Sequence, residues 1–294
     1  MSVRLRPKVL SVFLARALAA GLVATVAHPG APALSRPLDD VMTTGVLRVV
    51  VYYDNAPFSS GETNEDAVGI DADLGRALAK RLGVKPDIIV RTAGEEVDDD
   101  VRSNIWQGPR TGGVKGDVML HVPLDRGLVA RNPLAVFING YHHEETVLAL
   151  NADAVGATAG PEVFRDKKVA VKFSTAAHYH LAFTEEGAYR KNVSPFMKLE
   201  GAVQSFLAQE SVGLMGTRSE LEWALRGAPF RVRYVSPDIA PTLKSAWTIG
   251  MVVADDSRDL GHALAKALRD VRESGELKAI FTRHGVSLVP PPTY

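Results

Sequence analysis

The stretch from Gly45 to Gly83 most constrains what this chain can fold into. It begins with an apolar, β-branched run at 46–53, which is typical of a strand buried on both faces. A helix is predicted next, because apolar residues recur every fourth position before the C-capping Gly83: Ile70, Leu74, Leu78 and Leu82. A second strand is predicted at 87–91, so the stretch is interpreted as a βαβ unit.

The loop after the first strand holds the first candidate ligand-binding residues, Tyr53, Asp54 and Phe58. Ligands of open α/β sheets sit outside the carboxyl ends of the strands, close to helix N-termini. The ring of Phe58 is expected to stack on a ligand, and the alternative is an aromatic side chain that covers the edge of the core.

Composition limits the class of protein. The 294 residues suffice for one or two domains, and 34 basic residues balance 34 acidic ones, so no electrostatic footprint for nucleic acid is present. The chain has no cysteine, which excludes disulfides, thiolate metal sites and a lipid-modified cysteine.

Residues 1–33 are predicted to be a secretory signal peptide, with a charged start, an apolar segment and small residues before cleavage at Ala27 or Ala33. Arg16 interrupts the apolar segment, which argues against a membrane anchor. We therefore expect a periplasmic protein without a lipid anchor.

A second strand-to-helix unit is predicted at 168–186. Ser174 or Thr175 caps the helix that follows the strand, and this helix N-terminus is able to receive an anion, although capping alone explains both residues. Further strands are predicted at 117–122, 146–150, 212–215, 231–235 and 245–254, and further helices at 201–208, 219–225 and 260–273. This order predicts two α/β lobes facing each other across a cleft.

Four motifs in order resemble the family 3 periplasmic solute-binding proteins, whose typical ligands are polar amino acids. They are T-G-V-L-R-V with Pro57-Phe58, G-I-D-A-D-L at 69–74, F-R-D-K-K-V-A-V at 164–171, and I-G-M-V-V-A-D-D-S-R-D-L followed by R-E-S-G-E-L-K-A-I-F-T-R-H-G at 272–285.

The resemblance implies a type II periplasmic-binding-protein fold. Lobe one would comprise 34–140 and 248–294, lobe two 145–245, and the hinge two strands near 141–146 and 247–251, with the lobes closing on a ligand. It also implies a monomer that binds a small molecule for an ABC transporter permease, with no cofactor, no enzymatic activity and no nucleic-acid partner.

Two departures from the family concern the ligand. The family's carboxylate-binding arginine has no residue in register, since Arg126 comes early and Arg131 late. The family's aspartate for the ligand ammonium is replaced by Gly216. Thr217, which follows that glycine, and His121, on the strand at 117–122, complete the candidate ligand-binding residues.

A narrower resemblance covers A-G-E-E-V-D-D-D-V-R, I-W-Q-G-P-R and D-V-M-L-H-V-P-L-D, which are similar to the accessory J proteins of methanol-oxidation clusters. It implies the alternative function of an accessory protein that binds a periplasmic quinoprotein dehydrogenase, with the ligand cleft modified or lost.

Metal binding and catalysis were the remaining possibilities. An acidic loop and a histidine-rich segment offer ligands without the spacing of a known metal motif, so no metal is expected: Glu95, Glu96, Asp98, Asp99 and Asp100, and His121, His142, His143, Glu144 and Glu145. G-x-S-x-G, P-loop and dinucleotide motifs are absent. Asp71 and Asp73 open a helix, where the helix dipole accounts for them. Because some relatives of this fold are dehydratases, an enzyme stays open as a third alternative.

Overall fold

The computed structural model describes residues 36–109, 112–239 and 243–292. The predicted signal peptide at 1–33 lies outside these ranges. No helix within them has both the length and the apolar character that a membrane span requires.

Within these ranges, nine strands form one mixed sheet in the order β2-β1-β3-β9-β4-β7-β5-β6, with β8 pairing beside β4. The strands are β1 (Val46–Tyr52), β2 (Lys85–Arg91), β3 (Val118–Pro123), β4 (Ala135–Asn151), β5 (Val169–Lys172), β6 (Val193–Phe196), β7 (Gly213–Thr217), β8 (Val232–Val235) and β9 (Ala246–Ala254). The helices are α1 (Leu38–Thr44), α2 (Ile70–Leu82), α3 (Val97–Val101), α4 (Arg126–Arg131), α5 (Ala152–Val155), α6 (Ala176–Phe183), α7 (Leu199–Leu207), α8 (Arg218–Ala224), α9 (Arg258–Glu273) and α10 (Glu276–Arg283).

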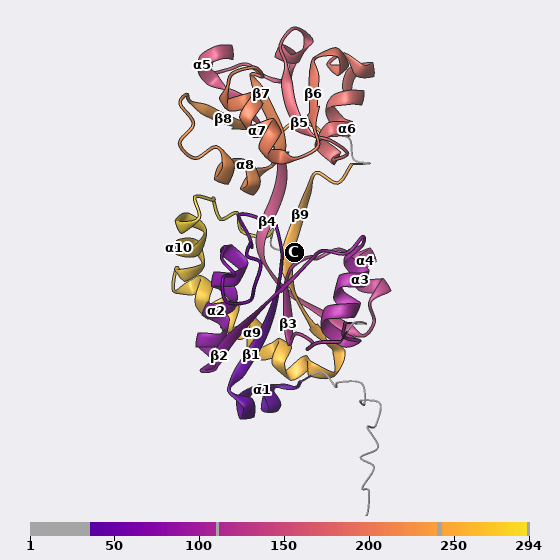
Figure 1. Cartoon of the computed structure of the whole chain (residues 1–294), viewed down its shortest axis with the longest axis vertical. Helices are drawn as coiled ribbons and strands as arrows, with labels where there is room; N and C mark the ends of the chain where they lie inside the picture. The colour runs from indigo at the N-terminus through magenta and orange to yellow at the C-terminus, as the bar shows by residue number, and fades with distance from the viewer. Residues whose placement is uncertain (1–35, 110–111, 240–242, 293–294) are drawn as a thin grey trace, which may run out of the picture. The chain divides into compact units, whose positions relative to one another are not determined.

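The long strand β4 belongs to both halves of the sheet (Figure 1). Its residues 135–145 pair with β9, and its residues 146–151 pair with β7 and β8. We call β2, β1, β3, β9 and the first part of β4 the first half-sheet. The second half-sheet is β6, β5, β7, β8 and the second part of β4.

The first half-sheet is covered on both faces. On β1, Leu47, Val49 and Val51 pack into a cluster with α2, α9 and α10. The alternate residues Val50 and Tyr52 pack into a second cluster with the α3 region. A strand buried on both faces needs apolar residues at consecutive positions, which explains the apolar run of β1, interrupted only by Arg48 near its start.

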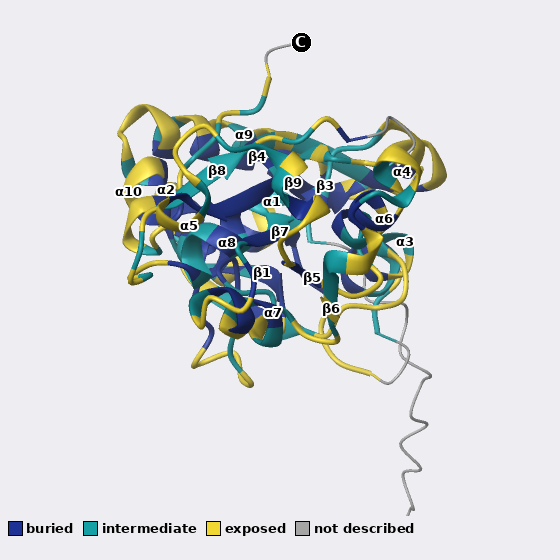
Figure 2. Cartoon of the chain, turned by 90° about the horizontal axis from the view of Figure 1, so that it is seen from above, coloured by how far each residue is buried: buried dark blue, intermediate teal, exposed yellow. Residues whose placement is uncertain are grey.

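The second half-sheet has the same layered construction. Leu148, Val171 and Met215 face α6, whereas Ala149, Ala170 and Leu214 face α7 and α8. Figure 2 shows the strands mostly buried and many outer helical turns exposed. The structure is the mixed α/β fold that the sequence predicted.

Local differences from the prediction have local causes. Strand β6 was not predicted, because V-S-P-F carries Pro195 and lies outside any long apolar run. The helix expected to reach residue 186 ends at Phe183, since Glu185 and Glu186 take positive φ angles of 51° and 58°. The strand expected at 146–150 is the last part of the much longer β4.

Candidate functional site

The parallel strands β5 and β7 create the place where a ligand site is expected. They pair directly, with Val171 opposite Met215. After β5 the chain passes through α6 to β6, on the far side of β5. After β7 it passes through α8 toward β8, beyond β4, so the two connections leave in opposite directions. Such a switch point leaves a crevice outside the carboxyl ends of the strands.

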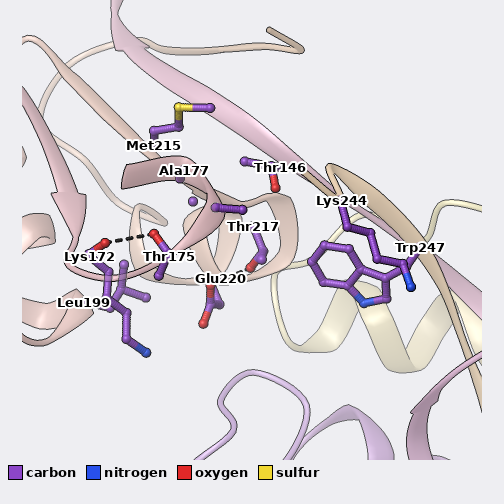
Figure 3. A pocket seen from close by; sticks show the side chains of 12 residues that line it. Thr146, Lys172, Thr175, Ala177, Leu199, Met215, Thr217, Glu220, Lys244 and Trp247 are labelled. Atoms are coloured by element: carbon purple, nitrogen blue, oxygen red, sulfur yellow. Dashed lines mark hydrogen bonds between the residues drawn. The ribbon is translucent and has the colours of Figure 1, made fainter. Parts of the chain in front are cut away.

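A cavity of about 280 Å³ lies at this switch point. Its lining comes from the ends of β5 and β7, the first turns of α6 and α8, and neighbouring residues of α7, β4 and β9: Thr146, Lys172, Thr175, Ala176, Ala177, Leu199, Met215, Gly216, Thr217, Glu220, Lys244 and Trp247. We call this cavity the switch-point pocket. Figure 3 shows the side chains of Lys244 and Trp247 on one side, across from Thr175, Thr217 and Glu220.

Thr175 fixes the α6 side of the pocket. As the N-cap of α6, its hydroxyl accepts from the backbone N–H of His178 at 3.2 Å and donates to the carbonyl of Lys172 at 2.8 Å. The N–H groups of Ala176 and Ala177 in the first helical turn have no intrahelical acceptor, as at any helix N-terminus. With Lys172 beside them, they form a region that suits an anionic group.

Glu220 supplies a carboxylate on the α8 side. Thr217 is the N-cap of α8, and its hydroxyl donates to Glu220 Oε2 at 2.5 Å. Gly216 directly precedes Thr217, and a Cβ there would lie 3.2 Å from Leu221. A side chain at 216 would therefore begin against a buried leucine. The carboxylate that the sequence lacked at 216 is present in the same pocket four residues later.

Lys244 and Trp247 form the remaining wall. Lys244 Nζ lies 2.9 Å from Asp125 Oδ2, so the lysine already has an anionic partner on the loop before α4. The indole of Trp247 offers a flat apolar surface, while the pocket also contains Leu199 and Met215. Polar groups of both charges thus lie around a partly apolar cavity, which is the usual construction of a small-molecule site.

The structure brings only some of the predicted site residues to this pocket. Thr175 and Thr217 line it, and Ser174 lies next to Thr175 in an exposed position with a φ of 60°. Tyr53 and Asp54 are exposed after β1 and belong to a different part of the fold. Phe58 is 3% exposed and packs in the core of the first half-sheet. The prediction that these residues bind a ligand therefore stays a prediction.

The two arginines considered as carboxylate clamps have different surroundings. Arg131 binds both carboxylate oxygens of Asp98, with Nε and Nη2 at 3.1 and 2.9 Å, and this lowers the pKa of Asp98. Arg126 begins α4 and lines a separate hollow of about 340 Å³ with Val129 and Phe137. Neither arginine lines the switch-point pocket.

The acidic loop and the histidines are dispersed into separate contacts. Asp100 accepts from Tyr52 and from the N–H of Gly94, and burial raises the pKa of Asp100. His142 Nε2 lies 3.1 Å from Ser219 Oγ, whereas His143 Nδ1 lies 3.3 Å from Thr248. Among the described residues, no three histidine or acidic side chains are grouped so that they could hold a metal ion.

Sequence reasoning missed the charged and aromatic lining of the pocket, namely Lys172, Glu220, Lys244 and Trp247. Glu220 carried a usable signal, because T-R-S-E at 217–220 matches the pattern of a helix capping box. In the structure the two side chains bond to each other, while Thr217 makes no side-chain bond to the helix backbone.

The architecture is that of the type II periplasmic binding proteins. An ancestral cationic amino acid solute binding protein is 21% identical, with a TM-score of 0.65, over 84% of this chain and 99% of that one. A substrate binding protein of a polar amino acid ABC uptake transporter from Streptococcus thermophilus is 12% identical, with a TM-score of 0.66, over 86% and 90%.

A third solved structure is an amino acid ABC transporter substrate-binding protein from Streptococcus pneumoniae, bound to L-arginine. It is 17% identical, with a TM-score of 0.53, over 86% of this chain and 99% of that one. A scan against protein families finds no match, and neither does a search of curated proteins. At these identities the comparisons establish the fold.

Proposed function

We propose that this protein is a periplasmic solute-binding protein that captures a small polar solute and delivers it to an ABC transporter. The observation that carries the proposal is the switch-point pocket, a cavity at the carboxyl ends of β5 and β7 in a fold whose solved neighbours bind solutes for transport. Two lobes joined by β4 and β9 would then close on the solute.

The pocket's charges favour a solute with an anionic and a cationic end. An anionic group has the α6 N-terminus, Thr175 and Lys172 as partners, and a cationic group has the carboxylate of Glu220. Glu220 would thus supply the carboxylate for a ligand ammonium that the family has as an aspartate at the position of Gly216. Trp247 would cover the apolar part of the solute.

A thermal-shift panel tests this function. It contains L-arginine, L-lysine, L-glutamate, L-cysteine, ethanolamine and lactate, so that each charge pattern is represented. A solute at a hundredfold excess over its Kd stabilises the folded state by about 2.7 kcal/mol. For a chain of this size that corresponds to a rise in Tm of about 5–10 °C.

Two matched variants locate the binding. Glu220→Gln keeps the size of the side chain and removes its charge, and we expect it to weaken a zwitterion more than lactate. Glu222→Gln on the same helix is the control, because Glu222 does not line the pocket. If no solute in the panel raises Tm, the transport proposal is wrong. The dehydrogenase-accessory role remains a prediction from sequence alone, and co-purification with a quinoprotein dehydrogenase would support it.

A further inference from the structure

A closed ring of hydrogen bonds surrounds His121 at the end of β3. The backbone N–H of His121 donates to the hydroxyl oxygen of Tyr141 at 3.1 Å, and that hydroxyl donates to Asp71 Oδ1 at 2.5 Å. The other oxygen, Oδ2, lies 3.1 Å from Nδ1 of the His121 ring. The buried carboxylate of Asp71 therefore contacts the His121 ring directly and the His121 backbone through the hydroxyl of Tyr141.

The backbone at His121 is strained where it meets this network. Its φ is +62°, and the register between β3 and β9 shifts between Met119 and Val122. A left-handed conformation at a residue other than glycine costs about 1–2 kcal/mol, and a bulge of this kind re-aims a side chain. The hydrogen bond from the His121 N–H to Tyr141 lies within this irregularity.

The network also determines what the ring presents outward. Asp71 is fully buried, and a carboxylate accepts hydrogen bonds at both oxygens, so the ring proton lies on Nδ1. In the neutral ring the lone pair is then on Nε2. Within residues 36–109, 112–239 and 243–292, Nε2 of His121 has no hydrogen-bond partner. It is also not one of the fully buried polar atoms. The His121 side chain as a whole is 18% exposed.

The surroundings fix this ring further. Phe58 packs against it edge-on with centroids 4.4 Å apart, and Tyr52 does so at 6.3 Å. The titratable neighbours are Tyr52 on β1, Tyr141 and His142 on β4, and Asp71 on α2. Burial raises the pKa of both tyrosines and lowers that of His142 to about 3, so these three side chains stay neutral near pH 7.

The position in the fold matches that of the switch-point pocket. β1 and β3 pair in parallel, and after β1 the chain turns toward β2, on the opposite side from β3. Their carboxyl ends are the switch point of the first half-sheet. Tyr52 is the last residue of β1, and His121 lies two residues before the end of β3.

We propose that His121 is a specificity-determining residue whose Nε2 accepts a hydrogen bond from a protonated amine or guanidinium of the solute. This inference rests on the proposed solute-binding function and adds to it a recognition group in the first half-sheet. The negative charge of Asp71 behind the ring favours a cationic donor over an anion. Asp71 and Tyr141 are positioning residues, because they act through His121.

Nitrogen NMR of the ¹⁵N-histidine-labelled protein tests the proposal directly. His121→Gln identifies the His121 signals by their loss. In the free protein we expect Nδ1 to be protonated and Nε2 to be unprotonated. Addition of L-arginine or L-lysine is expected to move the Nε2 signal toward that of a hydrogen-bonded nitrogen, with saturation, whereas lactate leaves it unchanged.

Affinity provides the second readout. A hydrogen bond to a charged donor is lost in His121→Leu, and we expect binding of the same amine to weaken roughly tenfold or more, with a smaller loss in His121→Gln, which keeps an acceptor. A solute that raises Tm while the Nε2 signal stays still overturns this inference and leaves the transport function intact. An unprotonated Nδ1 also overturns it, and a panel without any binder overturns both proposals.

Discussion

His142 is fully buried on β4, and its burial should lower the free energy of unfolding at acid pH. Its Nε2 is 3.1 Å from Ser219 Oγ, and its Nδ1 accepts from the N–H of Val289 at 3.3 Å. Its ring packs against that of Phe281, with centroids 4.8 Å apart. Burial, followed by the neighbouring His121 and His143, lowers the pKa of His142 from 6.5 to about 3. The folded protein therefore excludes a proton that the unfolded chain binds.

The sign and size of the effect follow from linkage. A depressed folded-state pKa contributes stability that is present above the unfolded value of 6.5 and is lost as the pH falls toward the folded value. At pH 5 the unfolded chain gains about 1.5 pKa units of protonation free energy, or about 2 kcal/mol, from this one histidine.

Urea unfolding at pH 7.5 and pH 5.0, followed by tryptophan fluorescence, measures this. His142→Gln removes the titrating group, so the free energy of unfolding should fall by about 2 kcal/mol less between the two pH values than in the wild type. Loss of ring packing lowers stability equally at both and cancels. His262→Gln is the control, since His262 is exposed on α9. An equal pH dependence in the wild type and His142→Gln would refute the reasoning.

Three further predictions follow from single contacts. Burial raises the pKa of Glu144, so its stabilising contribution is complete at acid pH and is lost as the pH rises above the ordinary value of 4.5. In urea unfolding, Glu144→Gln should therefore gain stability relative to the wild type between pH 4.5 and pH 8. A constant difference in the free energy of unfolding would contradict this. Gly213→Ala places a Cβ 2.5 Å from Phe164 Cζ in the core, so thermal unfolding should show a loss of about 1–3 kcal/mol, and an unchanged Tm would be inconsistent with that contact. Arg131→Ala removes an ion pair in which the arginine side chain is 61% exposed, so stability should change by at most about 1 kcal/mol and solute affinity should not change, whereas a tenfold loss of affinity would make Arg131 the carboxylate clamp.

Periodicity predicted most of the elements because their burial is regular. The run at 46–53 was recognisable as a strand since both of its faces are buried, and α2 was recognisable from its single apolar face and Gly83, which takes the expected left-handed conformation. Strand β6 was not predicted because it is only four residues long, includes a proline and lies at the edge of the sheet. Short elements depend on their neighbours more than on their own pattern.

The candidate sites were only partly readable. Thr175 was named because helix capping leaves a local signal, whereas Thr217 was named from the family resemblance at Gly216; each stands at the end of a strand. Lys244 and Trp247 lie far along the chain from both, so nothing local indicated that they line the same pocket. From sequence, the helix dipole was sufficient to explain Asp71. Nothing in the sequence indicated its contacts with His121 and Tyr141.

By itself, the sequence determined most of the strands and helices and their order, because these follow from the spacing of apolar residues and from caps within a few positions. Only the tertiary structure decided which polar groups meet. Tyr141 lies 70 residues after Asp71, and His121 lies 50 residues after it, yet one carboxylate binds both. Such a contact depends on the pairing of β3, β4 and β9 and on a bulge at His121, and none of these leaves a periodic trace in the chain.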